Sequence, residues 1–246
     1  MKSLFKNCLH SNDIFLVEKV NSYGIPIAII KSSSSINGIK SLHNELSGIK
    51  WYNNIMNYNI LNLSIEIETT HYLRTKCDYV EGVAPMYYAG FNSNKHYIKS
   101  IVDLYCVLWP KSKNINNRFA IHGDFSIVNF LFKCDGNPVI LDWEHFTLNI
   151  GPLGFDALNF LFEQIWLEKE NNNDLFEIVD EISYFYKTLK ENKAIDEKYF
   201  SKSPLLSTVN FIKQNKNIWG LQVNKLPVLK FSKKEIKDID DFLCEA

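Results

Sequence analysis

The chain has 246 residues, of which 46% are hydrophobic and 22% are charged, a balance typical of a globular protein with a buried core. A formal net charge of −1 provides no general field that would attract nucleic acid or anionic lipid, so we expect no nucleic-acid partner. The first residues lack the apolar segment of a secretory signal, and no run of about 18 apolar residues predicts a membrane span. We therefore expect a cytoplasmic protein.

Apolar runs predict strands over residues 14–20, 25–31, 64–69 and 72–80, and residues 37–53 read as a helix. A further apolar-periodic helix is expected over 97–109. Residues 119–121 lead into a polar loop, and residues 130–132 and 139–141 predict the two strands of a β-hairpin around the turn at 133–138. The second half of the chain then reads as mainly helical. Its expected helices span residues 155–167, 174–189, 204–218 and 233–243.

The most informative stretch is the loop His122–Asn129, followed by Asp142 after the hairpin. Phosphoryl transfer requires an oriented hydroxyl and divalent cations at the phosphate oxygens. Asp124 can accept a hydrogen bond from the attacking hydroxyl, whereas Asn129 and Asp142 supply the hard oxygen ligands that Mg²⁺ prefers. An Asp and an Asn at this spacing can arise by chance in an Asn-rich chain. The preceding His-Gly, the hairpin and the second Asp together point to a site instead.

His122-Gly123-Asp124 with Asn129, followed by Asp142-Trp143-Glu144, resembles the aminoglycoside phosphotransferase and choline kinase superfamily. Asp142-Trp143-Glu144, followed by Gly151-Pro152 and by the run Phe155–Leu161, also resembles kinase-like proteins associated with bacterial surface-polysaccharide synthesis. The resemblance implies an α+β, two-lobed protein-kinase-like fold. Residues 1–81 would form a small antiparallel-sheet lobe that binds nucleotide. Residues 82–246 would form a larger, mainly helical lobe that binds the acceptor and carries the catalytic residue.

In the catalytic half, the resemblance implies that Asp124 is the catalytic base and that Asn129 and Asp142 bind Mg²⁺. His122 is expected to brace the loop, because Asp124 already fills the role of base. Asp156 has two explanations that the sequence leaves open. It either accepts hydrogen bonds from the loop backbone or is an acidic residue favoured by the N-terminal helix dipole.

In the nucleotide-binding half, the resemblance implies that Lys31, at the end of its strand, contacts the phosphates of ATP. Glu45 lies on the helix that follows and is expected to form an ion pair that orients Lys31. Tyr79, Val80 and Glu81 correspond to the hinge between the lobes, whose backbone groups hold the adenine. The other interpretation of this stretch is simply a strand that ends at Gly82.

The main departure from the family is the turn between the first two strands. A protein-kinase-like enzyme covers the phosphates there with a glycine-rich loop, but residues 8–13 contain no glycine. Ser11 or Asn12 would have to supply polar contacts in its place. This departure favours an alternative, a catalytically silent kinase-fold protein that binds nucleotide or a protein partner. Retention of Asp124, Asn129 and Asp142 argues against that alternative.

Charge is unevenly distributed in the helical half. Acidic residues dominate from Asp156 to Glu181, and lysines dominate from Lys187 to Lys237. The acidic stretch could attract a cationic acceptor such as an aminoglycoside or choline, but solvated helix faces are the commoner explanation. Three large aromatic side chains could line an acceptor pocket, although such residues more often belong to the core. They are Trp143, Trp166 and Trp219.

The leading hypothesis is an ATP- and Mg²⁺-dependent O-phosphotransferase that acts on a hydroxyl of a small molecule or glycan. Its expected cofactors are ATP and Mg²⁺. The sequence selects neither one acceptor nor an oligomeric state.

Overall fold

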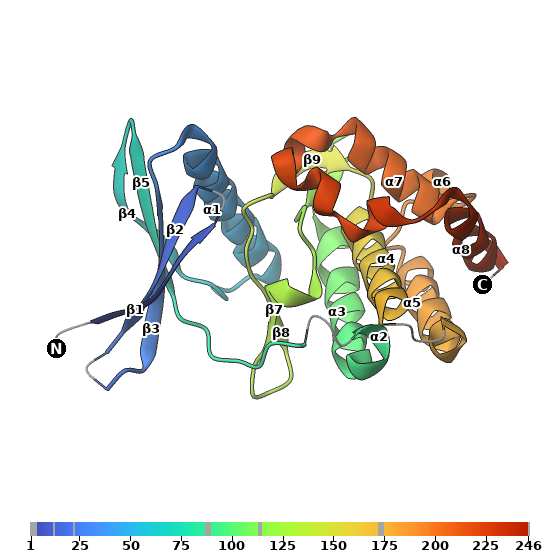
Figure 1. The fold of residues 1–246 in the computed structure, drawn as a ribbon, viewed down its shortest axis with the longest axis horizontal. Helices are drawn as coiled ribbons and strands as arrows, with labels where there is room; N and C mark the ends of the chain where they lie inside the picture. Colours follow the sequence, from blue (N-terminus) through green and yellow to red (C-terminus); the bar gives the residue numbers. More distant parts are fainter. Residues whose placement is uncertain are drawn as a thin grey trace. The chain divides into compact units, whose positions relative to one another are not determined.

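The computed structural model describes residues 4–11, 13–21, 23–86, 90–112, 115–171 and 175–245 (Figure 1). The chain separates into two compact units by its contacts. Unit 1 consists of Met1–Gly82 together with Asp142–Phe146, and unit 2 of Val83–Leu141 together with Thr147–Ala246. The structure mixes helices and strands, as expected. The short segment Asp142–Phe146 belongs to unit 1, whereas it was expected in the second lobe.

Unit 1 contains a five-stranded antiparallel sheet with the order β1-β2-β3-β5-β4. Its strands are β1 (Leu4–Ser11), β2 (Ile14–Val20), β3 (Pro26–Ser33), β4 (Leu63–Thr69) and β5 (Tyr72–Asp78). The predicted strands are present, and β1 is an additional strand that pairs with β2. Lys31 lies on the central strand β3, opposite Leu16 on one side and Thr75 on the other. The sheet therefore holds this lysine from both sides.

Helix α1 (Ile36–Met56) packs on this sheet and extends the predicted helix at both ends. Ser35 caps it, because the side-chain hydroxyl accepts a hydrogen bond from the N–H of Gly38 at 3.0 Å. Leu42, Leu46 and Ile49 are buried at helical spacing and form its apolar face. Asn57 ends the helix in the left-handed conformation, with φ of 60°.

The segment Asp142–Phe146 is attached to α1 by aromatic packing. The Trp143 ring centroid lies 5.7 Å from that of Trp51 and 5.3 Å from that of Tyr52. Gly48 makes this close approach possible, because a Cβ built there would lie 2.7 Å from Cβ of Trp143 and 3.0 Å from Cβ of Phe146. Glycine costs about 1 kcal/mol relative to alanine inside a helix, so its presence here is explained by packing.

Gly48→Ala tests this packing. We expect the variant to lose about 1–3 kcal/mol of unfolding free energy, because the added methyl group displaces Trp143 and Phe146, although alanine is the better helix former. Urea denaturation followed by tryptophan fluorescence measures the change. Ser47→Ala, at the neighbouring exposed position of α1, is the matched control and should be neutral within about 0.5 kcal/mol. Equal stability of the two variants would show that Gly48 is not a packing requirement.

Unit 2 contains two antiparallel strand pairs and a group of helices. Strand β7 (Phe130–Phe132) pairs with β8 (Pro138–Ile140) in the predicted hairpin, and β6 (Phe119–Ile121) pairs with β9 (Thr147–Gly151), which was not predicted. The helices are α2 (Gly90–Ser93), α3 (Lys95–Leu108), α4 (Phe155–Glu170), α5 (Val179–Glu191), α6 (Glu197–Phe200), α7 (Pro204–Gln214) and α8 (Lys233–Glu245). Short 3₁₀ segments are η2 (Trp109–Lys111), η3 (Ile127–Asn129), η4 (Leu175–Ile178), η5 (Lys216–Ile218), η6 (Gly220–Lys225) and η7 (Pro227–Lys230).

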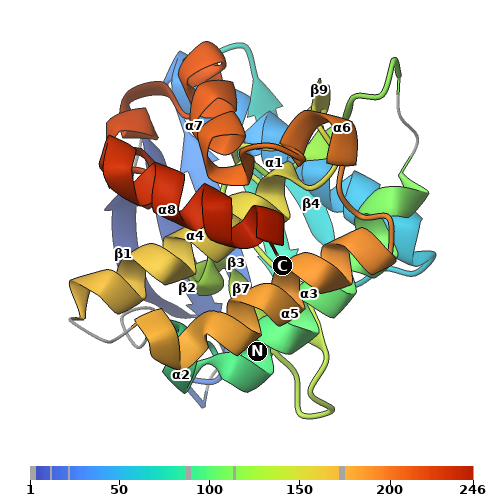
Figure 2. The same cartoon turned by 90° about the vertical axis from the view of Figure 1, so that its right-hand side faces the viewer.

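Helix α4 is the centre of unit 2. Almost all of its side chains are buried, and it contacts both α2 and α7, while α3 and α5 lie side by side (Figure 2). Phe160 packs its ring against Phe125, Phe130 and Phe185. The core of the unit therefore extends from α4 to the loop that begins at His122.

Within the described part of the chain, no helix is both long enough and apolar enough to cross a bilayer.

Candidate active site

A cluster of three charged side chains lies in unit 1, and two of them are largely buried. Nζ of Lys31 is 2.8 Å from Oε1 of Glu45 and 2.7 Å from Oδ1 of Asp142. The Lys31 and Glu45 side chains are 15% and 7% exposed, whereas that of Asp142 is 37% exposed. The predicted ion pair between Lys31 and Glu45 is confirmed. The third member, Asp142, was expected in the other lobe, residues 82–246, but lies in unit 1 with Lys31 and Glu45.

The cluster changes the titration of its members. Burial would lower the pKa of Lys31, but attraction to Glu45 and then to Asp142 raises that pKa above its ordinary value, so the ammonium group stays charged. Burial raises the pKa of Glu45, and Lys31 partly offsets this effect. Burial also raises the pKa of Glu144, and the nearby charge of Asp142 adds to the shift. Negative charge is therefore dense around one lysine.

Asp142 adopts a backbone conformation that few residues accept. Its φ of 55° lies in the left-handed region, which aspartate tolerates better than most non-glycine residues. The next residue, Trp143, is fully buried and holds the chain in place on one side. On the other side, the N–H of Leu141 donates to the carbonyl oxygen of Asn129 at 2.8 Å. The strained residue is therefore fixed by its neighbours, a pattern common at functional sites.

In unit 2, His122 and Gly123 open the loop that was predicted from its sequence. Gly123 has φ of 84°, which explains the glycine at this turn. The buried His122 ring contacts the Leu141 carbonyl oxygen through Nε2 at 2.9 Å and accepts the Asp124 N–H through Nδ1 at 3.3 Å. Nδ1 acts as an acceptor, so the proton lies on Nε2. The predicted role of His122 as a bracing residue is confirmed.

Two carboxylates of α4 bind the loop on either side of Asp124. Asp156 accepts hydrogen bonds from the N–H groups of His122 at 2.8 Å and Gly123 at 3.1 Å. Glu163, two helical turns later, accepts from Oγ of Ser126 at 3.0 Å. Of the two explanations for Asp156, hydrogen bonding to the loop is therefore confirmed.

The buried carboxylates correct the expectation of solvated helix faces. Asp156, Glu163 and Glu168 are at most 7% exposed, so the acidic stretch belongs in part to the interior of unit 2. Burial raises the pKa of Asp156 to about 7, although the N–H groups of His122 and Gly123 favour its ionised form. Sequence reasoning did not identify Glu163. Its hydrogen-bond partner, Ser126, lies 37 positions away, and the local sequence of the helix does not show that this glutamate is buried.

Asn129 holds the side chain of Asp124. Its Nδ2 donates to Oδ2 of Asp124 at 3.0 Å and to the Asp124 carbonyl oxygen at 2.8 Å. Both bonds use the amide nitrogen, so the orientation of the carboxamide is fixed with Oδ1 directed away from them. Asp124 itself is half-buried. The structure thus brings together the predicted base and one predicted metal ligand within unit 2.

The two predicted magnesium ligands lie in different units and each carries an oxygen donor. Across the described ranges, no group of three or more His, Cys, Asp and Glu side chains is arranged to hold a metal ion. Mg²⁺ in nucleotide sites uses only one or two protein ligands and takes the rest from phosphates and water. The Asn129 carboxamide oxygen in unit 2 and the Asp142 carboxylate in unit 1 are oxygen donors of the required kind.

The predicted hinge residues follow β5. The N–H of Tyr79 donates to the carbonyl oxygen of Ile27 at 3.1 Å, so this residue continues the pairing of the sheet. Tyr79 and Glu81 are exposed and Val80 is partly buried. Their role in holding adenine stays a prediction. Asn12, in the glycine-free turn, lies outside the described residues.

The three tryptophans belong to the core. Trp143, Trp166 and Trp219 are each at most 9% exposed. Trp166 packs edge-on against Phe231, and Nε1 of Trp219 donates to the carbonyl oxygen of Gly123 at 2.5 Å. Trp219 therefore holds the backbone of the loop through this hydrogen bond, and its buried ring is not available to line an acceptor pocket.

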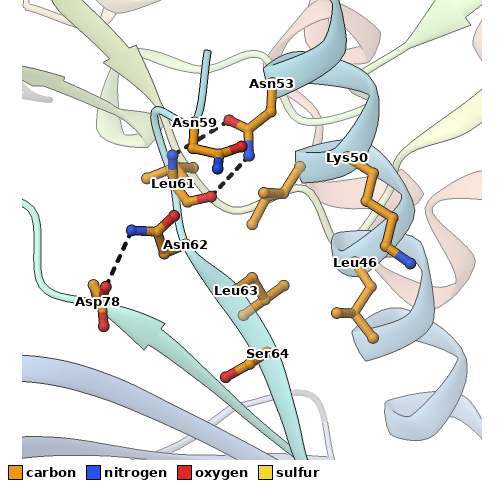
Figure 3. A pocket seen from close by; sticks show the side chains of 10 residues that line it. Leu46, Lys50, Asn53, Asn59, Leu61, Asn62, Leu63, Ser64 and Asp78 are labelled. Atoms are coloured by element: carbon orange, nitrogen blue, oxygen red, sulfur yellow. Dashed lines mark hydrogen bonds between the residues drawn. The ribbon is translucent and has the colours of Figure 1, made fainter.

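A separate pocket of about 330 Å³ lies in unit 1 between α1 and the start of β4 (Figure 3). Several of its polar side chains form hydrogen bonds with one another or with nearby backbone groups. Asn53 donates to the Leu61 carbonyl oxygen at 2.8 Å and accepts from the N–H of Ile60, while Asn62 donates to Asp78 at 3.2 Å. None of the predicted site residues lines this pocket.

No protein-family model matches the chain, and no curated protein matches it.

Lys31→Met tests the charge cluster. Removing the cation leaves Glu45 buried beside Asp142 without compensation, so we expect a loss of about 3–5 kcal/mol of unfolding free energy. The double variant Lys31→Met/Glu45→Gln should be more stable than the single one, because no buried charge remains unpaired. Lys50→Met, at an exposed position of α1, is the control. Urea denaturation measures all three, and a Lys31→Met variant as stable as Lys50→Met would contradict the interpretation.

Proposed function

We propose that the protein is a Mg-ATP-dependent O-phosphotransferase with a two-lobed protein-kinase-like fold. One observation carries the proposal. Lys31, assigned from sequence to the phosphates, is bonded to both Glu45, assigned to orient it, and Asp142, assigned to magnesium. A lysine at the protein surface rarely has two carboxylate partners. Burying charged groups costs free energy unless opposite charges compensate one another, so an ordinary surface lysine would not show this arrangement.

Asp124 is proposed to orient the hydroxyl that attacks the γ-phosphoryl group. Its Oδ2 is held by Asn129, which fixes the direction of the carboxylate. A carboxylate is too weak a base to remove the proton of an alcohol before the reaction starts. Asp124 would therefore position the nucleophile and take up the proton as the new bond to phosphorus forms.

Lys31 is proposed to contact the phosphates of ATP, and Glu45 to keep it in position. Asn129 and Asp142 would hold Mg²⁺, which when bound neutralises charge on the phosphate oxygens. Tyr79, Val80 and Glu81 would contact adenine through their backbone. Asp156 and Glu163 are positioning residues, because both act on the loop that carries Asp124 rather than on the substrate.

The acceptor is proposed to be a small molecule or glycan in the cytoplasm, where ATP is available. Only a short segment separates Asp142 from Asp156, and residues 147–151 of that segment form β9 in the pair with β6. This length leaves little chain for the activation and docking segments that a protein substrate requires. A compact acceptor suits the segment better.

Incubation with Mg-ATP and pooled sugars, amino alcohols and aminoglycosides tests the proposal, with ADP release and phosphorus NMR as readouts. We expect transfer by the wild-type protein and a decrease of about 10²–10⁴-fold in Asp124→Asn, because the nucleophile loses its acceptor. Asp135→Asn, in the exposed turn between β7 and β8, is the charge-matched control and should retain activity. Transfer undiminished in Asp124→Asn would exclude the mechanism. Binding of Mg-ATP without transfer to any acceptor would favour the silent, nucleotide-binding alternative.

A further inference from the structure

An acid-free segment covers residues 198–234 of unit 2. It contains eight lysines and neither aspartate nor glutamate, although the whole chain has a net charge of −1. Such an excess creates a local positive potential, and the rest of the chain carries the opposite charge, formally −9 (−1 for the whole chain minus +8 for the segment). The proposed function gives this excess of lysine no role.

The middle of the acid-free segment lies against the loop that carries Asp124. Trp219, in this segment, is 3% exposed and donates from Nε1 to the carbonyl oxygen of Gly123, the residue before Asp124. Its ring also packs near Phe155 at the start of α4, with centroids 5.9 Å apart. A buried indole with a hydrogen bond fixes the backbone around it.

Two lysines flank this anchor. The carbonyl oxygen of Lys216 accepts the N–H of Trp219 at 3.2 Å, so Lys216 is one 3₁₀ turn away, about 6 Å along the axis. Lys225 ends η6, the 3₁₀ segment that begins directly after Trp219. Both lysines are exposed, and in the part of the chain that is described neither forms an ion pair. Lys230 differs, since it lies over the Trp166 ring, 5.4 Å from its centroid.

The neighbouring acidic residues do not form a site for a cationic acceptor. Both oxygens of Asp156 accept backbone N–H groups, and Glu163 accepts from Ser126. These carboxylates are buried and serve the loop itself. In the stretch of residues 216–225 around Trp219, the charged side chains are those of the exposed Lys216 and Lys225.

We infer that the phosphoryl acceptor carries an anionic group, a carboxylate or phosphate, that Lys216 and Lys225 bind. An acceptor of this kind is repelled by Asp124 and by the phosphates of ATP, so cations without carboxylate partners are needed to hold it near the loop. The inference rests on the proposed function, because it takes the bound anion to be the molecule whose hydroxyl group is phosphorylated. The charge of the bound molecule is tested separately, by binding alone.

The binding test compares sugars that differ in charge. Galactose, galactosamine, galacturonate and galactose 6-phosphate are titrated into the full-length protein by calorimetry at about 10 mM and about 500 mM salt. We expect the two anionic sugars to bind about tenfold more tightly than the others at low salt, and the advantage to shrink at high salt because exposed charges are screened. Oligogalacturonate, titrated in parallel, separates a glycan from a free sugar, since a glycan site binds it more tightly than the monomer.

Paired variants assign the effect to the two lysines. Lys216→Ala/Lys225→Ala should weaken binding of the anionic sugars about tenfold, while Lys216→Arg keeps it, because arginine retains the charge. Lys187→Ala/Lys237→Ala removes the same charge from exposed positions of α5 and α8 and should bind as the wild type does. Thermal melting confirms that each variant is folded.

The outcomes separate the inference from the proposed function. Anionic sugars that bind no better than galactose or galactosamine, or binding that is unchanged in Lys216→Ala/Lys225→Ala, overturn the inference. ADP release with Mg-ATP is recorded in the same samples. Preferential transfer to a neutral or cationic sugar retains the proposed function and rejects the inference. Binding of anionic sugars that depends on both lysines supports the inference even where no transfer occurs, and the absence of transfer then counts against the proposed function.

Discussion

The arrangement of unit 1 depends on one buried cation. Nζ of Lys31 donates to two carboxylates from different parts of the chain, so a single ammonium group joins β3, α1 and the segment after β8. Carboxylates that share one partner repel each other, and the lysine between them compensates both this repulsion and the burial of Glu45. Aromatic packing of Trp143 on α1 adds the apolar contacts that keep Asp142 in its left-handed conformation. The ion pair of Asp142 and the aromatic packing of Trp143 thus hold the segment Asp142–Phe146 in one position within unit 1.

Much of the fold follows from local sequence patterns. The apolar runs at 14–20 and 25–31 predict β2 and β3 correctly, and helical periodicity predicts α1 and α4. β9 was not predicted, because Thr147–Gly151 becomes a strand only by pairing with β6, which precedes it by more than twenty residues. Such pairing is a tertiary contact, and local propensity does not report it.

The candidate site likewise contains contacts that the sequence predicts and contacts that it does not. The Lys31–Glu45 ion pair was predictable, because a strand lysine followed by a helical glutamate has a defined geometry. The contact between Lys31 and Asp142 was not, since it spans 111 positions and follows from the packing of Trp143 on α1. Glu163 was also missed, because its spacing of two turns from Asp156 gains meaning only when both carboxylates are seen to hold one loop. Buried carboxylates with backbone or hydroxyl partners look the same in sequence as solvated ones.

Asp142 and Lys31 are proposed to form a nucleotide site that needs a divalent cation. Calorimetric titration with ATP, in Mg²⁺ and again in EDTA, tests it most directly, using the wild-type protein and Asp142→Asn, which keeps a residue that tolerates the left-handed conformation. The account predicts that the wild-type protein binds ATP at least about tenfold more tightly in Mg²⁺ than in EDTA and that Asp142→Asn loses this difference. Failure of the wild-type protein to bind ATP, or a Mg²⁺ dependence that is unchanged in Asp142→Asn, would contradict it.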